Sequence, residues 1–205
     1  MTDAATRAAY DAVAGLYADM FRDHLDGLPV DRALISAFAD LVRGRGPVAD
    51  VGCGPGQVTA RLHALGLDAS GVDLSPAMIA RARADHPHLR FAEGAMKALA
   101  FPDASLAGVL AWYSIIHLDP AELPDAFAEL HRVLAPGGHL LLAFQSTDGD
   151  VPDPFDHKVV RAHRWPIDHI AGVARRTGLA EVARLLRRPT ETEHSPAGHL
   201  LLRKA

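Results

Sequence analysis

Three glycines alternate with other residues in a short loop, and this spacing suits a small anionic ligand. The loop follows the apolar stretch Pro47–Val51 and contains Gly52, Gly54 and Gly56. Glycine lets a backbone turn sharply and approach a ligand without a Cβ clash. A helix is expected directly after the loop, and the free N–H groups at a helix N-terminus attract anions. The loop is therefore the predicted centre of a ligand site.

The glycine spacing differs from the dinucleotide-binding fingerprint G-x-G-x-x-G. A third glycine at that spacing would replace Gln57 or Thr59. Pro55 also removes a backbone donor from the loop, so a smaller anion fits better than a pyrophosphate. Asp73 ends the second predicted strand, where a carboxylate can accept hydrogen bonds from both hydroxyls of a ribose. The pattern predicts a nucleoside-type ligand and disfavours the alternative of a nicotinamide-dependent oxidoreductase.

Aromatic and imidazole side chains follow the fourth predicted strand, 106–112. Trp112 ends this strand, and Tyr113 and His117 come directly after it. Ligands bind beyond the carboxyl ends of the strands in an open parallel sheet, so these residues are expected to face an acceptor cavity. His117 has an ordinary pKa near neutrality, which suits a base or an orienting group. A core position for Trp112 and Tyr113 is the alternative.

A stretch rich in proline and aspartate, 145–165, fits neither a helix nor a strand pattern. It contains His157, His163 and Trp165, and we expect it to form a lid over the acceptor, with a solvated loop as the alternative. The chain has twelve histidines but no H-x-x-x-H pair, and only one cysteine, so no metal site is expected. Cys53 is expected to be a small buried residue rather than a catalytic thiol.

The elements that must position these residues alternate between strand and helix from about residue 47 to 145. This alternation predicts a parallel sheet with helices on both faces. We expect two helices within 5–43, further helices that begin near 57, 75 and 119, and a last helix from Pro166. The remaining strands are expected at 69–73, 88–92 and 139–144, and two final strands near 182–186 and 199–202. The predicted fold class is α/β: a Rossmann-like, doubly wound, seven-stranded sheet, mostly parallel, with a C-terminal antiparallel hairpin turning at 196–198.

Composition limits the broad class of protein. The chain has 205 residues, 49% of them hydrophobic, and a formal net charge of −4. That size suits one domain, and an acidic balance disfavours a nucleic-acid partner. No apolar run reaches the length of a membrane span, and the N-terminus does not resemble a signal peptide. One cysteine favours a reducing compartment, so a cytoplasmic protein is expected.

The chain is expected to be a single domain, 1–205, with four parts. These parts are an N-terminal helical cap at 1–43, a ligand-binding core at 47–145, an acceptor-side lid at 145–165, and a C-terminal helix and hairpin at 166–205. We expect a monomer or a homodimer.

Three segments together carry a family resemblance. The stretches VADVGCGPGQVTARL, GVDLS and AELHRVLAPGGHLLLAF are similar to those of class I S-adenosylmethionine-dependent methyltransferases. The likeness is to the short, single-domain members that act on small molecules, and it is close over about residues 10 to 145. It implies S-adenosylmethionine as the cofactor, a small-molecule acceptor, and methyl transfer by in-line displacement with S-adenosylhomocysteine as the product.

The resemblance also implies roles for individual residues. The glycine loop would lie under the methionine and ribose of the cofactor, Asp73 would hold the ribose hydroxyls, and two N-terminal tyrosines would cover the site. The implied cofactor-binding residues are Tyr10, Tyr17, Asp50, Gly52, Cys53, Gly54, Gly56, Asp73, Leu74, Met78, Ala95, Met96, Ala111 and Trp112. The implied acceptor-binding residues are Tyr113, His117, His157, His163 and Trp165, and the catalytic candidates are His117, Tyr17 and Tyr113.

The sequence departs from the family pattern at two places, Ala95 and 106–107, and the first of them bears on the cofactor. Ala95 stands where the family usually carries an aspartate that accepts a hydrogen bond from the adenine amino group. Losing such a bond typically costs about 0.5–1.5 kcal/mol. This departure keeps open the alternative of a methyltransferase-like fold that binds the cofactor without transferring a methyl group, as a cyclisation enzyme or a regulator.

Overall fold

A computed structural model describes residues 3–191 and 193–205. Its main sheet has seven strands in the order β3-β2-β1-β4-β5-β9-β8. The strands are β1 (Val48–Val51), β2 (Ala69–Asp73), β3 (Arg90–Glu93), β4 (Leu106–Trp112), β5 (Leu134–Gln145), β8 (Leu179–Arg187) and β9 (Ala197–Lys204). The first five pair in parallel, and β9 pairs antiparallel with both β5 and β8. The predicted fold class is confirmed.

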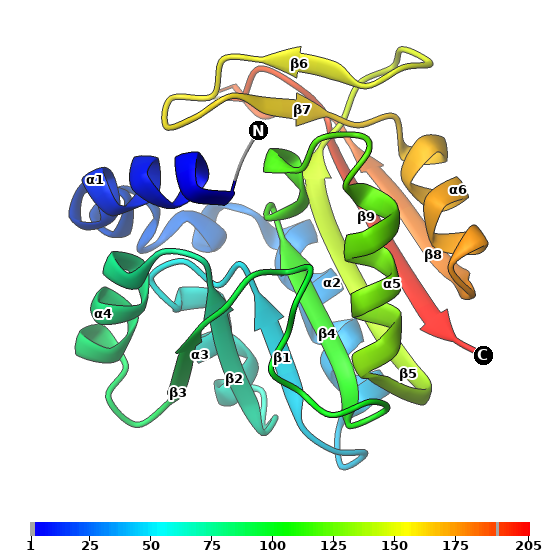
Figure 1. Cartoon of the computed structure of the whole chain (residues 1–205), viewed down its shortest axis with the longest axis horizontal. Helices are drawn as coiled ribbons and strands as arrows, with labels where there is room; N and C mark the ends of the chain where they lie inside the picture. The colour runs from blue at the N-terminus through cyan, green and yellow to red at the C-terminus, as the bar shows by residue number, and fades with distance from the viewer. Residues whose placement is uncertain (1–2, 192) are drawn as a thin grey trace.

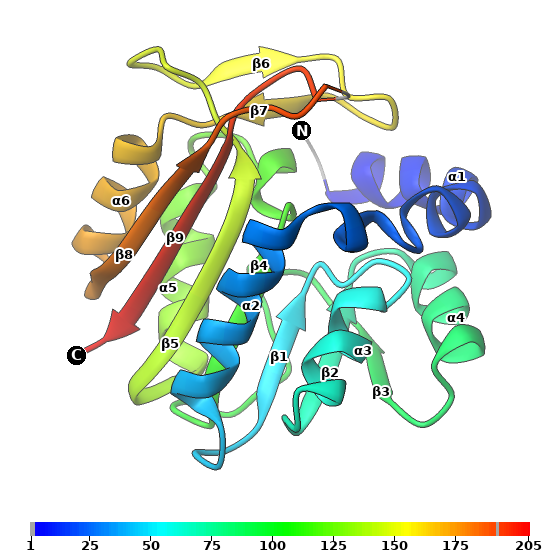
Figure 2. The same cartoon turned by 180° about the vertical axis from the view of Figure 1, so that it is seen from behind.

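Helices cover both faces of the sheet (Figure 1). The helices are α1 (Asp3–Phe21), α2 (Pro29–Val42), α3 (Gln57–Ala64), α4 (Pro76–Asp85), α5 (Leu123–Val133) and α6 (Ile167–Arg176). Helices α5 and α6 lie on the face shown in Figure 1, and Figure 2 shows α2 and α3 on the opposite face. Helix α1 packs beside α4, near the carboxyl ends of β1 and β2.

Two hydrophobic clusters hold the helices to the sheet. Phe127 and Leu130 of α5 pack with Leu142 on one face, and Phe38 of α2 packs with Leu110 on the other. The central strand β4 has apolar residues at nearly every position because both of its sides are covered. This two-sided core fixes the strand ends that form the edge of the candidate site.

The segment expected to be an irregular lid contains a small second sheet. Strands β6 (Asp153–Phe155) and β7 (Ala162–Arg164) pair antiparallel, and this ribbon lies across the upper end of the main sheet (Figure 1). The Arg164 guanidinium lies 4.2 Å from the centre of the Phe155 ring and also pairs with Asp153. Each strand has only three residues, which is too short for an alternating pattern to be visible in the sequence.

Several predicted boundaries also differ from the structure. The 196–198 stretch was expected to be a hairpin turn, but Ala197 already belongs to β9, which lies between β5 and β8. Helix α5 begins at Leu123 rather than near Asp119, because residues 120–122 form a turn in which the Glu122 carboxylate accepts from the Asp119 N–H. Strand β5 begins at Leu134, which pairs with Leu106 ahead of the Pro-Gly-Gly stretch.

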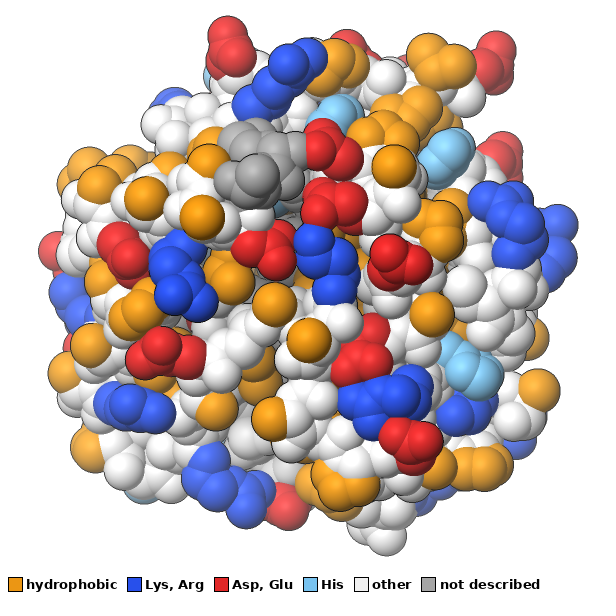
Figure 3. Space-filling model, viewed as in Figure 1, with side chains coloured by type: hydrophobic (Ala, Val, Ile, Leu, Met, Phe, Trp, Pro, Cys, Tyr) orange, Lys and Arg blue, Asp and Glu red, His pale blue; other side chains and the backbone are white. Residues whose placement is uncertain are grey.

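The surface on this side of the molecule carries mixed charge. Acidic and basic side chains alternate across the face in Figure 3, without a large area of one sign. Within the described residues, no helix is both long enough and apolar enough to cross a membrane.

Candidate functional site

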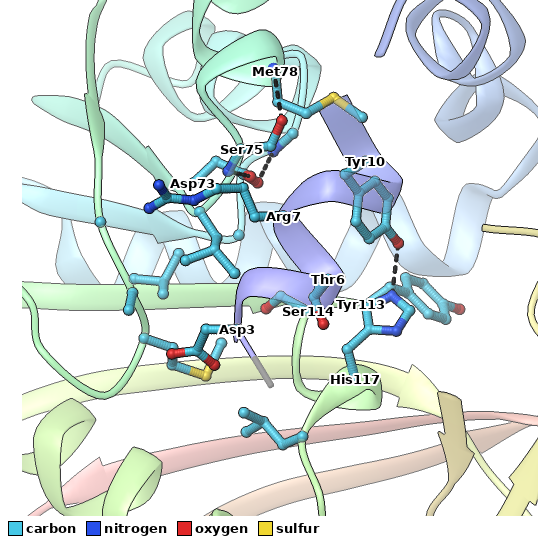
Figure 4. A pocket seen from close by; sticks show the side chains of 18 of the residues that line it. Asp3, Thr6, Arg7, Tyr10, Asp73, Ser75, Met78, Tyr113, Ser114 and His117 are labelled. Atoms are coloured by element: carbon cyan, nitrogen blue, oxygen red, sulfur yellow. Dashed lines mark hydrogen bonds between the residues drawn. The ribbon is translucent and has the colours of Figure 1, made fainter. Parts of the chain in front are cut away.

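A cavity of about 890 Å³, counted to its open mouth, lies at the carboxyl ends of β1, β2 and β4. The residues that line it are Asp3, Thr6, Arg7, Tyr10, Tyr17, Val51, Gly52, Gly54, Asp73, Leu74, Ser75, Met78, Gly94, Ala95, Met96, Lys97, Trp112, Tyr113, Ser114, His117 and Leu118. Asp73 and Ser75 lie on one side, and Tyr10, Tyr113 and His117 lie on the other (Figure 4). The cavity therefore joins the two groups of residues that the sequence placed at separate strand ends.

The glycine loop approaches the cavity so closely that a side chain would not fit at Gly52. Its φ is +78°, and a Cβ there would lie 2.2 Å from the Ser114 Cβ. The Ser114 hydroxyl lines the cavity and is a buried oxygen without a hydrogen-bond partner within the described residues. Bare backbone on one side and an unpaired hydroxyl beside it leave room and hydrogen-bonding capacity for a polar ligand.

Asp73 is held in place by backbone N–H groups of the glycine loop and of Ser75. One carboxylate oxygen accepts from the Gly54 N–H at 2.8 Å, and the other accepts from the Ser75 N–H at 2.9 Å. Burial raises the pKa of this carboxyl, and the backbone donors of Ser75 and Gly54 oppose the rise. A carboxylate oxygen has two lone pairs, so each oxygen keeps capacity for one further donor, such as a ribose hydroxyl.

Four of the predicted cofactor-binding residues lie outside the cavity lining. Asp50 is buried beneath the loop and accepts from the Thr59 hydroxyl at 2.7 Å. Cys53 and Ala111 are buried in the core, as expected for Cys53, and Gly56 caps the N-terminus of α3 with a φ of +86°. These residues support the loop from below, and any role toward a cofactor is indirect.

Helix α1 brings two tyrosines over the cavity. The rings of Tyr10 and Tyr17 pack edge to face, 5.6 Å apart between their centres. Burial raises the pKa of both hydroxyls, that of Tyr17 to about 12, so both stay protonated at neutral pH. The helix is fastened to α4 by Asp11, which accepts from the Ser75 hydroxyl at 2.5 Å and from the Ala77 N–H at 3.1 Å.

His117 is paired with Tyr10 across the cavity. The Tyr10 oxygen lies 2.6 Å from Nε2 of His117, and Nδ1 of His117 lies 3.4 Å from the Arg161 carbonyl oxygen. Because a carbonyl only accepts, we assign the proton to Nδ1, and Nε2 then accepts from the Tyr10 hydroxyl. Burial lowers the pKa of His117 to about 4, so the imidazole is neutral at pH 7. The ordinary pKa assumed from the sequence is thereby corrected.

The three predicted acceptor residues of the 145–165 stretch lie in different surroundings. The ring of His157 lies 5.4 Å from that of His117, which places it at the edge of the site. Trp165 is fully buried in the core, and His163 is also buried, with its ring 5.1 Å from that of Trp165. Neither of these two residues lines the cavity, so the structure does not bring them to the other predicted acceptor residues.

Trp112 and Tyr113 form a wall of the cavity next to His117. Their rings lie 5.9 Å apart at 82°. Tyr113 has a φ of +54°, a conformation that is uncommon for a bulky residue and often occurs at functional sites. This backbone turn at the end of β4 places the ring against the cavity.

Sequence reasoning missed several lining residues, chiefly Asp3, Thr6, Arg7, Val51, Gly94, Lys97, Ser114 and Leu118. Ser75 had a recognisable signal, because Ser-Pro is typical of a helix N-cap, and its hydroxyl accepts from the Met78 N–H. The first turn of α1 had no recognisable signal in the sequence, since its place over the cavity depends on packing against α4. The described residues contain no group of three or more histidine, cysteine, aspartate or glutamate side chains able to hold a metal ion.

Several known proteins that are similar to this chain are named methyltransferases. A family model described as a methyltransferase domain matches residues 48–138. The chain is 34% identical over 139 residues to demethylmenaquinone methyltransferase of Chlorobaculum tepidum, covering 64% of this chain and 56% of that protein. It is 37% identical over 101 residues to malonyl-[acyl-carrier protein] O-methyltransferase of Erwinia billingiae, and this match covers 49% of this chain and 39% of that protein. The chain thus spans about half or less of the length of these relatives.

Solved structures share the fold at low identity. A protein from Pyrococcus horikoshii superposes with a TM-score of 0.71 at 21% identity, covering 90% of this chain and 91% of that one. A glycopeptide N-methyltransferase in complex with S-adenosylmethionine gives a TM-score of 0.68 at 17% identity, covering 85% and 87%.

Proposed function

We propose that the chain is a class I S-adenosylmethionine-dependent methyltransferase and that it transfers a methyl group from S-adenosylmethionine to a small-molecule acceptor; the match of residues 48–138 to a methyltransferase-domain model and the likeness to named methyltransferases support this. The observation that carries this proposal is one cavity with two chemically different sides. The side formed by Gly52, Gly54 and Asp73 offers bare backbone and a carboxylate. The side formed by Trp112, Tyr113 and His117 offers aromatic surface and a neutral imidazole.

The cofactor side has the groups that a nucleoside with an amino-acid tail requires. Asp73 would accept from the ribose hydroxyls, and Gly52 and Gly54 would let the tail lie against the backbone. Leu74, Met78 and Met96 provide apolar surface for the adenine. Ala95 also lines this side but has no side-chain acceptor, so the adenine amino group would depend on a backbone carbonyl or water. Tyr10 and Tyr17 close the cavity from above.

The reaction requires orientation of the acceptor and, for a carbon or phenol acceptor, the removal of one proton. Bound S-adenosylmethionine supplies an electrophilic methyl group on a sulfonium, which leaves as a neutral thioether. The aromatic wall would hold the acceptor atom in line with that methyl group, which is the main source of rate in such a transfer. A hydroxyl acceptor would replace the Tyr10 hydroxyl at His117, and Nε2 would take the acceptor proton as the new bond to carbon forms.

The relatives support a small acceptor without specifying it. Their names give demethylmenaquinone and malonyl-[acyl-carrier protein] as the molecules acted on. A cytoplasmic location, a monomeric or homodimeric state and the lack of a nucleic-acid partner complete the proposal, favoured by the single cysteine and the net charge of −4. The division into a cap at 1–43, a core at 47–145, a lid at 145–165 and a C-terminal part at 166–205 stays a prediction.

The proposal is tested first at the cofactor. We expect S-adenosylhomocysteine to bind and to raise the melting temperature, whereas NAD does neither. Asp73→Ala should abolish S-adenosylhomocysteine binding in calorimetry, because it removes the ribose acceptor and releases the Gly54 and Ser75 N–H groups. Asp125→Ala, at an exposed position on α5, is the matched control. Equal binding by the Asp73 variant would contradict the assignment.

The transfer step is tested with a panel of small acceptors. Formation of S-adenosylhomocysteine in the presence of an acceptor, together with a methylated product in the mass spectrum, is the expected result. Cofactor binding without product from any acceptor class would instead favour the alternative, in which the fold binds S-adenosylmethionine for cyclisation or regulation.

A further inference from the structure

A second carboxylate lines the cavity on its cofactor side. It belongs to Asp3, in the first turn of α1. Figure 4 shows Asp3 on the same side of the cavity as Asp73, away from Tyr10 and His117. Asp3 and Asp73 are far apart in sequence, and Asp3 reaches this place because α1 packs against α4.

The base of a nucleoside bound at Asp73 would lie beside the stretch 94–97. Asp73 ends β2, and the Gly94 N–H, directly after the neighbouring strand β3, donates to the Asp73 carbonyl oxygen at 2.9 Å. A ribose held by the Asp73 carboxylate therefore has this stretch next to it, together with the apolar side chains of Leu74 and Met78. An adenine in this place has an exocyclic amino group, and leaving such a donor without an acceptor costs free energy.

The side chains of 94–97 offer this amino group no strong acceptor. Gly94 and Ala95 have no polar side-chain atom. The Met96 sulfur is only a weak acceptor, and the Lys97 ammonium only donates. The Ala95 carbonyl oxygen already accepts from the Ala98 N–H at 3.0 Å. The strongest acceptor for the amino group therefore has to come from another element.

Lys97 joins the stretch to two carboxylates. Its ammonium lies 3.2 Å from Oδ1 of Asp3 and also pairs with Glu122. Both Glu122 oxygens are in use, one by Lys97 and the other by the Asp119 N–H at 2.9 Å, and Glu122 does not line the cavity. Asp3 does line it, and its Oδ2 has no partner within the described residues. Asp3 thus brings an available carboxylate oxygen to this end of the cavity.

The ion pair with Lys97 does not by itself account for Asp3. The Asp3 side chain is 44% exposed, and an ion pair at such a position contributes little to stability. Without Asp3, the Lys97 ammonium would still have Glu122 as its partner. The pair does orient the carboxylate, because the ammonium holds Oδ1 and leaves Oδ2 for a further donor.

We propose that Asp3 recognises the adenine amino group of the cofactor by accepting its N–H at Oδ2, with Lys97 as the positioning residue. This inference rests on the proposed function, which supplies the cofactor, and deepens it by naming a specificity determinant. A site built to bind an N–H group discriminates against an analogue that lacks it. Because Asp3 belongs to α1, the base would bind to the helix that covers the cavity as well as to the sheet.

The test compares two ligands that differ at one carbon of the base. They are S-adenosylhomocysteine and its 6-deamino analogue, which has hydrogen in place of the amino group and keeps all ring nitrogens. In calorimetry on the full chain, the wild type should bind S-adenosylhomocysteine at least about fivefold more tightly than the analogue. Asp3→Ala should reduce this preference to less than about twofold and leave the affinity for the analogue unchanged, because the analogue does not use Oδ2.

Two further variants separate recognition of the base from support of α1. Asp3→Asn keeps an acceptor oxygen without its charge, so it should retain part of the preference. The double variant Asp3→Ala, Ala95→Asp places a carboxylate within 94–97 itself and should regain the preference. Asp40→Ala is the control, since Asp40 is an exposed helical aspartate that pairs with Arg43 outside the cavity, and it should keep the full preference.

Three results would overturn the inference. Equal binding of both ligands by the wild type would show that the amino group is not recognised. An unchanged preference in Asp3→Ala would assign the amino group to a backbone carbonyl or water. A parallel loss of affinity for both ligands in Asp3→Ala would mean that Asp3 only supports α1. In each case the wild type still binds S-adenosylhomocysteine, whereas its failure to bind either ligand would contradict the proposed function itself.

Discussion

At the scale of single residues, burial changes what His117 can do. With a pKa of about 4, its imidazole is neutral at pH 7 and keeps a lone pair on Nε2. We expect His117→Ala to lower kcat by about 10²–10⁴-fold, the usual contribution of a general base, with little change in S-adenosylhomocysteine affinity. His63→Ala, at an exposed position on α3, serves as the control. An unchanged kcat would reject a catalytic role.

The same pKa sets the pH range of activity. The neutral form persists as the pH falls from 7 to about 5, and it is lost only as the pH passes through about 4. Wild-type turnover that depends on His117 should therefore show no decline near pH 6.5, where an exposed histidine would gain its proton.

Gly52 offers a test of the loop backbone. A side chain at this position meets Ser114 at 2.2 Å, and the φ of +78° disfavours any residue with a Cβ. Gly52→Ala should lower the free energy of unfolding by about 1–3 kcal/mol from the backbone alone and should abolish S-adenosylhomocysteine binding. Gly149→Ala is a suitable control, since the nearest atom to a Cβ there is 3.6 Å away. Wild-type affinity in the Gly52 variant would show that the ligand does not use this loop.

At the scale of elements, α1 is held over the cavity more by polar contacts than by apolar burial. Only Ala14 and Ala18 are buried within it, whereas Leu16 and Met20 are exposed. Asp11→Ala removes the acceptor for the Ser75 hydroxyl and the Ala77 N–H, so we expect about 1 kcal/mol of destabilisation and faster release of S-adenosylhomocysteine in stopped-flow experiments.

Asp23→Ala provides the comparison for α1, since Asp23 is exposed just beyond this helix and its side chain makes no cap hydrogen bond. An equal release rate in the Asp11 variant and the wild type would mean that α1 does not limit ligand exit.

The sequence predicted elements best where a local pattern determines them. Strand 106–112 has the predicted bounds because a continuous apolar run between turn signals is local information. The β6–β7 ribbon was missed because strands of three residues are too short to show an alternating pattern. The sequence also did not predict the order of β8 and β9 in the sheet, since an antiparallel pair can join β5 through either of its strands.

The residues of the site were likewise predicted well where a local motif marks them and poorly where none does. Gly52, Gly54 and Asp73 carry motif spacing, and the structure brings all three to one cavity. Trp165 carries no spacing signal, and its Pro- and Asp-rich neighbourhood suggested exposure, yet it is fully buried. The contact of Tyr10 with His117 joins residues 107 positions apart, so no local pattern predicts it.

At the scale of the whole molecule, two buried groups whose pKa values shift in opposite directions make opposing contributions to the pH dependence of stability. Burial raises the pKa of Asp50 to about 7, so its contribution to stability is full below its ordinary pKa and is lost as the pH rises through 7. The lowered pKa of His117 has the reverse effect: its contribution is full above 6.5 and is lost as the pH falls through about 4. The two contributions oppose each other between pH 4 and pH 7.

Asp50→Asn separates these contributions. The variant keeps an oxygen for the Thr59 hydroxyl but has no charge to bury. Because the wild type must bury a charge at pH 8, we expect Asp50→Asn to be the more stable protein at this pH, with a melting temperature higher by at least about 5 °C. The advantage should shrink as the pH falls below 7. An advantage that is constant from pH 8 to pH 5 would contradict the shifted pKa.

The position of β9 has a consequence for how the protein is made. Strand β8 leaves the ribosome before β9, yet β9 is the strand that joins it to β5. During synthesis, β8 therefore waits without its native partner, while β1 to β5 can already pair. The glycine loop, Asp73 and Trp112 belong to this early part, whereas the His199 ring that lies against Trp112 is added with β9. A nascent chain would therefore form the glycine loop and the end of β4 before it gains this last contact behind Trp112.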